Sequence, residues 1–193
     1  SETTKKIAAQ GQVFDTATTA MQKQDLVAAK TAFAELGQGE GGFAVIAGHM
    51  LAGVEKDLNG DKAAMEPHLK AAAEANKGLM GDLAMLKLAY AKADTAPLAE
   101  LETIARPLVD KGGHVGALAR ELVAAKALAS GEIERARSEY QALSLEIDAP
   151  GQMKVRVQQV LGTLPARAAA PAAPATTTPP ATPAQPPAQP GQQ

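Results

Sequence analysis

The sequence has no cysteine and no tryptophan, and it contains only three Phe and two Tyr in 193 residues. Without cysteine, a disulfide framework, a thiolate metal site and a cysteine nucleophile are all excluded. Aromatic residues make up 3% of the chain, so few side chains could stack on nucleic-acid bases or sugars. Charge of one sign is also lacking, because 19 Lys and Arg stand against 21 Asp and Glu. This balance argues against a nucleic-acid-binding surface.

Long hydrophobic runs are missing as well. No stretch of 18 apolar residues occurs, and no segment has the hydrophobic centre of a signal peptide. The chain begins at Ser1 without an initiator Met, so we expect that it has been processed or trimmed. We therefore expect any membrane anchor of the native protein to lie upstream of Ser1.

Proline is concentrated at one end of the chain. Nine of the 13 prolines lie between Pro165 and Pro190, in a stretch of Ala, Pro, Thr and Gln whose only charge is Arg167. Such a segment has too few large apolar side chains to offset the entropy of ordering. The composition predicts a folded domain over residues 1–164 and a disordered tail over 165–193. No basic residue flanks a PxxP core, which favours a spacer over a docking strand.

A pattern of about 36 residues recurs four times in the predicted domain. Each copy begins with an acidic residue or Pro, and apolar or small residues follow four, eight and eleven positions later. Because these offsets lie on one face of an α-helix, and acidic residues and Pro favour helix N-termini, each copy predicts a helix. The four sets are Asp25, Ala29, Phe33 and Leu36; Asp61, Met65, Leu69 and Ala72; Pro97, Leu101, Ala105 and Leu108; and Glu132, Ala136, Tyr140 and Leu143.

A small residue stands twelve positions before the second member of each set, at Ala17, Gly53, Ala89 and Ala124. Small residues let two helices of an antiparallel hairpin cross closely, so each copy predicts a helix, a tight turn and a second helix. No segment alternates with period two, so we expect no strand. The predicted helices span residues 4–21, 25–36, 43–58, 61–76, 79–92, 97–110, 115–130 and 132–144, with a ninth near 150–162.

The fold class that this spacing predicts is all-α: an α-solenoid of four divergent hairpins like those of tetratricopeptide repeats (TPR), plus a C-terminal capping helix. The aromatic residue usual early in the first helix is absent, and Val13, His49, Met85 and Arg120 stand there instead. A plain helical bundle and a coiled coil are the alternatives. Neither of them predicts four evenly spaced starts.

Several motifs in this order resemble one family. They are GFAVIA at 42–47, GD at 60–61, LMGDLAMLKLA at 79–89, GALAREL at 116–122, GE at 131–132 with AR at 136–137, and DAPGQMKVR at 148–156. Together they look like the TPR domain of the YfgM-type ancillary subunits of the Sec translocon. The likeness covers about residues 1–164. It departs from the family at His114-Val115-Gly116, where an aromatic residue and an Arg often stand.

The resemblance implies a periplasmic domain that an N-terminal helix, absent from this chain, anchors in the inner membrane of a Gram-negative bacterium. It further implies a scaffold near the SecYEG channel that helps to hand secreted proteins to periplasmic chaperones. The expected partners are therefore SecYEG, a PpiD-like foldase or unfolded secreted clients, and no nucleic acid. Membrane contact is expected only through the anchor upstream of Ser1.

Candidate catalytic and metal-binding patterns are weak. His49, His68 and His114 lack the spacing of metal ligands, and the glycine-rich stretch 37–42 lacks the GKS or GKT ending of a phosphate-binding loop. We therefore expect no enzyme activity, no cofactor and no metal. An enzyme would require a deep polar pocket with convergent ionisable groups.

Apolar side chains on the first helices of the hairpins are the candidate binding surface. We select Phe43, Met50, Val54, Leu86 and Tyr90 as groove residues, because soft apolar surfaces suit binding to apolar protein segments. The alternative is that these residues belong to the core. A second hypothesis for the function is a TPR coordinator of cell-envelope or peptidoglycan assembly that binds an envelope enzyme rather than secreted clients.

Overall fold

The structure is a computed structural model that describes residues 1–167, and this part of the chain is all-α. Of the predicted tail, residues 168–193 lie outside the described residues. Nine α-helices, one short 3-10 helix and no strand occur within residues 1–167. They are α1 (Glu2–Gln22), α2 (Leu26–Gly37), α3 (Gly42–Asn59), η1 (Lys62–Met65), α4 (Glu66–Ala75), α5 (Leu79–Lys92), α6 (Leu98–Lys111), α7 (Gly113–Ala129), α8 (Ile133–Leu145) and α9 (Gly151–Thr163).

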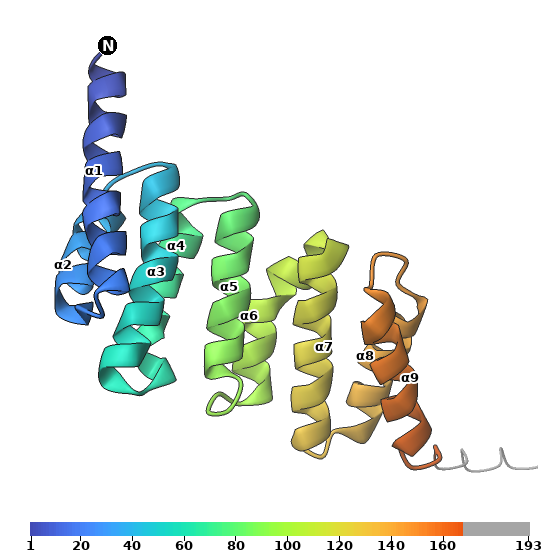
Figure 1. Ribbon diagram of the computed structural model, residues 1–193. Helices are drawn as coiled ribbons and strands as arrows, with labels where there is room; N and C mark the ends of the chain where they lie inside the picture. The colour runs from blue at the N-terminus through green and yellow to red at the C-terminus, as the bar shows by residue number, and fades with distance from the viewer. Residues whose placement is uncertain (168–193) are drawn as a thin grey trace, which may run out of the picture.

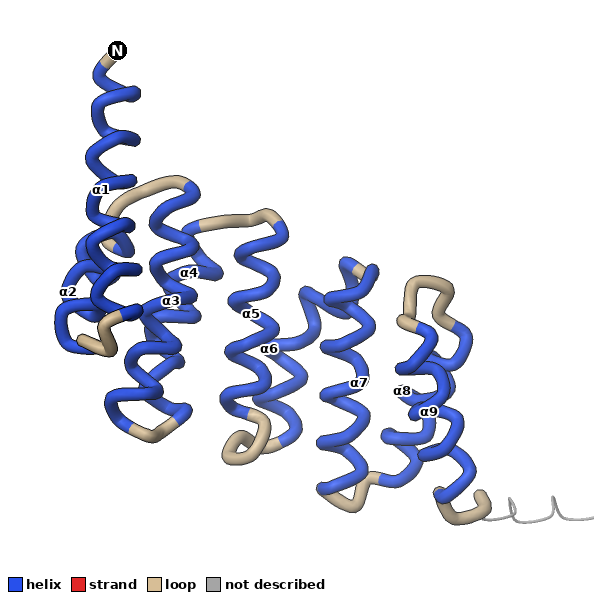
Figure 2. Tube along the Cα trace, in the orientation of Figure 1, coloured by secondary structure: helices blue, strands red, loops and turns tan. Residues whose placement is uncertain are grey.

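The helices form a row, with α1 and α2 at one end and α8 and α9 at the other (Figure 1). Each helix packs against the next one along the chain, and short loops join them (Figure 2). Further contacts join α1 to α3, α3 to α5 and α5 to α7. These four helices therefore form a continuous layer, which we call the first-helix layer.

Helix α1 reaches beyond its neighbours. Its N-terminal turns project past α2 and α3 (Figure 1), and the side chains of residues 1–9 are all exposed. Its buried residues are Ala17 and Ala20, near the other end. The packed part of α1 is thus its C-terminal half.

The helix bounds agree with the predicted ones to within two residues, with one exception. The segment predicted as a single helix over 61–76 begins as the 3-10 helix η1, and α4 starts only at Glu66. Pro67 explains the late start, because a residue without an amide hydrogen fits only the first turn of an α-helix. The prediction of one continuous helix here was wrong.

The turns follow from local chemistry. Asp25 caps α2 by accepting a hydrogen bond from the amide of Ala28 at 3.1 Å, and Asp61 caps η1 through the amide of Ala63 at 2.9 Å. Gly60 ends α3 in the left-handed region, with φ of 67°, a conformation that glycine adopts without strain. The acidic starts of the repeats are therefore helix caps where the structure shows them bonded.

The repeat positions form the core. All but one of the twelve apolar and small positions of the four sets are buried, and the exception, Met65, lies half-buried in η1. Ala17, Ala89 and Ala124 have no exposed surface. At these three positions, the close helix crossing predicted from the sequence agrees with complete burial.

Gly53 corrects the prediction for the fourth small position. A Cβ atom at Gly53 would meet no heavy atom within 4 Å, so no close crossing requires a glycine there. Gly53 instead lines an open cavity together with two residues of η1. The close approach between α3 and α4 lies instead at Gly48, whose Cβ would stand 2.8 Å from the Cβ of Ala72.

Two further glycines set the distance between successive hairpins. A Cβ at Gly81, near the start of α5, would lie 1.7 Å from the carbonyl oxygen of Asn76. A Cβ at Gly116, near the start of α7, would lie 2.7 Å from the carbonyl oxygen of Leu108. Any larger residue would push the first helix of the hairpin away from the preceding backbone.

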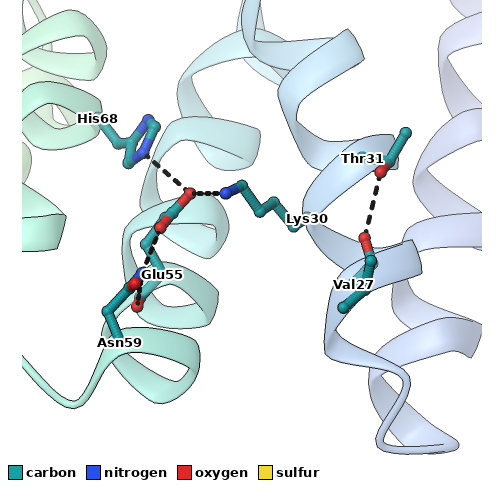
Figure 3. Close-up of polar contacts among 6 residues, drawn as sticks. All are labelled: Val27, Lys30, Thr31, Glu55, Asn59 and His68. Atoms are coloured by element: carbon teal, nitrogen blue, oxygen red, sulfur yellow. Dashed lines mark hydrogen bonds and ion pairs between the residues drawn. The ribbon is translucent and has the colours of Figure 1, made fainter.

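A buried carboxylate links three helices near the N-terminal end. The Glu55 side chain, on α3, accepts hydrogen bonds from Lys30 of α2 at 2.7 Å and from Asn59 at 2.7 Å (Figure 3). It also lies 3.7 Å from Nε2 of His68 on α4. The hydrogen bond from Lys30 is the main cause that lowers the pKa of Glu55 below its usual value of 4.5.

A second buried carboxylate links three helices farther along the chain. Glu139 of α8 pairs with Arg120 of α7 at 2.8 Å and with Arg135 of its own helix at 3.1 Å. Arg135 in turn pairs with Glu102 of α6 at 2.5 Å. Each buried Glu therefore fixes the relative position of three consecutive helices.

Alanine substitutions at two glycines of α3 test the corrected crossing. Gly53→Ala removes the conformational cost of a helical glycine and creates no clash, so we expect stability to rise by about 0.5–1 kcal/mol. Gly48→Ala drives a methyl group against Ala72, so we expect a loss of about 1–3 kcal/mol from overpacking. Urea unfolding followed by circular dichroism measures both, and equal effects of the two substitutions would contradict the assignment.

Substitution of Glu55 tests the three-helix link. Glu55→Gln keeps the shape of the side chain but removes the negative charge that accepts the hydrogen bond from Lys30. We therefore expect the free energy of unfolding to fall by about 1–2 kcal/mol at neutral pH. Because the folded pKa is lowered, this contribution is present above pH 4.5 and is lost as the pH falls through the folded pKa. Urea unfolding on both sides of pH 4.5 checks this dependence. The matched control is Glu35→Gln, at an exposed residue of α2.

Candidate protein-binding surface

The five groove residues predicted from the sequence do not form one surface. Val54 and Leu86 are 1% and 6% exposed and belong to the core, because neighbouring helices cover that side of α3 and α5. Phe43 and Met50 are half-buried and pack against the core of α1, α2 and α3. Tyr90 is 43% exposed. Among the five, Val54 and Leu86 thus offer no surface to a partner.

Phe43 has a structural role and also borders a cavity. Its ring lies 5.8 Å from that of Phe14, which packs edge-on against Phe33 at 6.1 Å, so all three phenylalanines of the chain form one cluster. The other side of Phe43 lines a cavity of about 590 Å³ between α1 and α3, here called the N-terminal cavity. Ile7 and Ile46, which are 53% and 38% exposed, line it too.

Tyr90 lines a different cavity, of about 440 Å³, which lies between α3 and α5 and which we call the α3–α5 cavity. Its volume lies within the usual range of ligand-binding pockets, about 300–1,000 Å³. Three helical segments contribute to its walls. The lining residues are His49, Gly53 and Lys56 of α3; Lys62 and Met65 of η1; and Lys87, Tyr90 and Ala91 of α5.

His49 joins the two walls of the α3–α5 cavity. Its Nε2 atom lies 2.9 Å from the carbonyl oxygen of Met80, and its Nδ1 atom lies 3.1 Å from Nζ of Lys87. A carbonyl only accepts and an ammonium only donates, so both bonds require a neutral ring with its proton on Nε2. Burial is the main cause that lowers the pKa of His49, the hydrogen bond to Met80 opposes this, and Lys87 lowers the pKa further.

The rim of the α3–α5 cavity is cationic. Lys62 pairs with Asp94 at 2.9 Å, but within residues 1–167 neither Lys56 nor Lys87 has a carboxylate at ion-pair distance. No Asp or Glu is among the residues that line the cavity. The cavity therefore carries a local positive charge in a chain whose net charge is -2.

Polar groups continue from Tyr90 toward the C-terminal end of the row. Burial raises the pKa of Tyr90 and the Glu121 carboxylate raises it further, while Arg156 opposes this shift. Glu121 of α7 holds Arg156 of α9 through two hydrogen bonds, of 3.1 and 2.9 Å. Tyr90 thus lies between a cationic cavity and a neutral ion pair.

Residues 1–167 contain neither a metal-binding cluster nor a membrane-spanning helix. No three His, Asp or Glu residues there lie close enough together to hold a metal ion. None of the helices in that part combines the length and the hydrophobicity that are needed to cross a membrane.

The lysines of the α3–α5 cavity were not predicted from the sequence. Lys56 lies three residues after Gly53 and Lys87 three before Tyr90, so each shares a helix face with a residue already under consideration. The sequence therefore shows a lysine on each of those helix faces. It does not show that α3 and α5 lie side by side, because they are about 30 residues apart in the chain.

The bond between His49 and Lys87 predicts a pH dependence of stability. The folded pKa of His49 is lowered from 6.5, so its contribution is present above pH 6.5 and is lost as the pH falls through the folded pKa. As the pH is lowered, we expect the free energy of unfolding to fall less steeply in His49→Gln than in the wild type. Urea unfolding on both sides of pH 6.5 measures this. His114→Gln, at an exposed residue, should keep the wild-type slope. A wild-type slope in His49→Gln as well would contradict the role of this bond.

Comparison with known proteins gives no relative from which a function could be transferred. No protein-family model matches the chain, and no curated protein and no solved structure matches it. The functional conclusion therefore depends on the chemistry of the two cavities and on the resemblance that the sequence motifs carry.

Proposed function

We propose that this chain is a non-enzymatic protein-interaction scaffold whose helices form an α-solenoid of four divergent TPR-like hairpins, with α9 as the cap. Two observations support the solenoid. The evenly spaced repeat starts coincide with the starts of helical segments, and α1, α3, α5 and α7 contact one another in sequence order. In such an arrangement the first helices line a common surface that is suited to extended partners.

The observation that carries the proposal is the pair of cavities in the first-helix layer. Large apolar side chains remain exposed there, with Ile7 and Ile46 at the N-terminal cavity and Tyr90 at the α3–α5 cavity. Exposed apolar side chains next to hollows on a protein surface mark sites of protein association. Lys56 and Lys87, which have no carboxylate partner within the described residues, favour partners that carry negative charge.

The cellular setting that we propose comes from the resemblance to YfgM-type subunits. On this basis the domain lies in the periplasm, anchored in the inner membrane by a helix upstream of Ser1, and assists the Sec translocon. The partners would be SecYEG, a PpiD-like foldase or unfolded secreted proteins. Two of the motifs that carry the resemblance also supply cavity residues: 42–47 contains Phe43 and Ile46, and 79–89 contains Lys87.

Photo-crosslinking in the native membrane tests this function. A photoreactive amino acid at Ile46 or at Tyr90 places the probe in one cavity or the other. We expect each of these probes to capture a SecYEG subunit, the foldase or a secreted chain, as identified by mass spectrometry. The control position is Val27, which is apolar and 67% exposed but lies on α2 outside the first-helix layer.

The outcome at the control position decides how the captures are interpreted. The same partners captured from Val27 would show that the crosslinks do not depend on the first-helix layer. Capture of an envelope-assembly enzyme from Ile46 or Tyr90 would favour the coordinator of envelope assembly instead. No capture from either cavity position would contradict the scaffold itself.

A further inference from the structure

One of the residues that line the α3–α5 cavity, Gly53, has no side chain. At the corresponding position of the other three hairpins stand Ala17, Ala89 and Ala124, and none of them has any exposed surface. Gly53 is half-exposed, and the space around its Cβ position is empty to 4 Å. At this one position the second hairpin is therefore open, whereas the alanines of the other three hairpins are completely covered.

Three lysines line the opening, and two of them have no carboxylate partner within the described residues. Lys56 and Lys87 lie on opposite walls, one on α3 and the other on α5, and each lacks a carboxylate partner among residues 1–167. Lys62 is the third cation, and it forms an exposed ion pair with Asp94. A ligand that brings carboxylates to Lys56 and Lys87 would form charge-assisted hydrogen bonds without displacing an internal partner.

Lys87 is held in place before any ligand arrives. One of its three N–H donors is directed to Nδ1 of His49, whose ring is fixed in turn by the carbonyl of Met80. Two donors remain for a ligand. Because part of the side-chain entropy is already lost in the free protein, binding at Lys87 costs less than at a freely rotating lysine.

Less polar side chains also line the cavity. They are Met65, which is half-buried, Ala91, which is buried, and Tyr90, which keeps 43% of its surface exposed. The flexible thioether of Met65 adapts to side chains of different shapes. A bare inorganic anion would use the lysines alone, whereas a peptide with both carboxylates and an apolar side chain would use the rim and the interior.

We propose that the α3–α5 cavity binds an acidic linear segment of a protein partner. An apolar side chain of the segment lies against Met65 and Tyr90, and flanking Asp or Glu side chains bond to Lys56 and Lys87. This inference rests on the proposed function as a protein-binding scaffold and adds the chemistry of the bound segment. Binding weakens with added salt, because the charges at the rim are exposed.

Fluorescence anisotropy with a designed peptide tests the proposal on the full 193-residue chain. The probe is a labelled five-residue peptide with a central Leu flanked on each side by two Glu, and the comparison peptide carries Gln in place of all four Glu. We expect the acidic peptide to bind at least about tenfold more tightly, which corresponds to about 1.4 kcal/mol. Equal binding of the two peptides would overturn the proposal.

Two kinds of variant separate the contributions of charge and space. Lys56→Gln combined with Lys87→Gln removes the unpaired cations, and Gly53→Leu places a bulky side chain in the cavity while all the lysines remain. We expect each variant to weaken binding of the acidic peptide at least about tenfold. The matched control is Lys5→Gln combined with Lys23→Gln, which removes two exposed lysines that do not line this cavity and should leave binding unchanged.

The remaining outcomes also decide the matter. Unchanged binding in folded Gly53→Leu, or in the Lys56 and Lys87 double variant, would overturn the proposal. Competition by inorganic phosphate or a single-stranded oligonucleotide as strong as that by the unlabelled acidic peptide would identify a general anion site and would also overturn it. Capture of partners at Ile46 without binding of the acidic peptide would leave the proposed function intact and remove this inference alone.

Discussion

Close contact between helix backbones is the constraint on which the rest of this structure depends. Short helices with few large side chains make an adequate core only where their backbones approach so closely that just a methyl group, or no side chain at all, fits between them. Fully buried alanines meet this need within the hairpins, and Gly48, Gly81 and Gly116 meet it where a Cβ would collide with a neighbouring segment. The order of the row, the continuous first-helix layer and the place of its cavities all follow from where such contacts form.

Buried charge complements this apolar packing. Glu55 and Glu139 are each nearly inaccessible to solvent, and each is bonded to cations from neighbouring segments. Removing a carboxylate from water is favourable only when such partners are present, so the position of each partner helix is narrowly specified. Apolar contacts alone would tolerate sliding of one helix along another. The two carboxylates therefore supply positional specificity that alanine-rich surfaces lack.

The sequence predicted the helices well and the surface poorly. Repeat spacing and caps such as Asp25 and Gly60 depend on nearby residues, so the helices could be read along the chain. The short start of α4 was also readable, since Pro67 is visible in the sequence. Whether Val54 faces the core or Gly53 faces a cavity depends on segments that arrive from elsewhere in the chain. Helical periodicity identifies a face, but it does not tell what covers that face.

The projecting start of α1 gives the two cavities different mechanical character. A helical stretch whose residues 1–9 contact little else is held by its own hydrogen bonds and by the cap at Ser1, and short helices of this kind are marginal in water. Few tertiary contacts therefore oppose local unfolding of residues 1–9. The N-terminal cavity has one wall in this stretch, at Ile7, whereas both walls of the α3–α5 cavity belong to packed helices. The N-terminal cavity therefore has one wall on a helical stretch with few tertiary contacts, whereas the α3–α5 cavity is enclosed by packed helical segments.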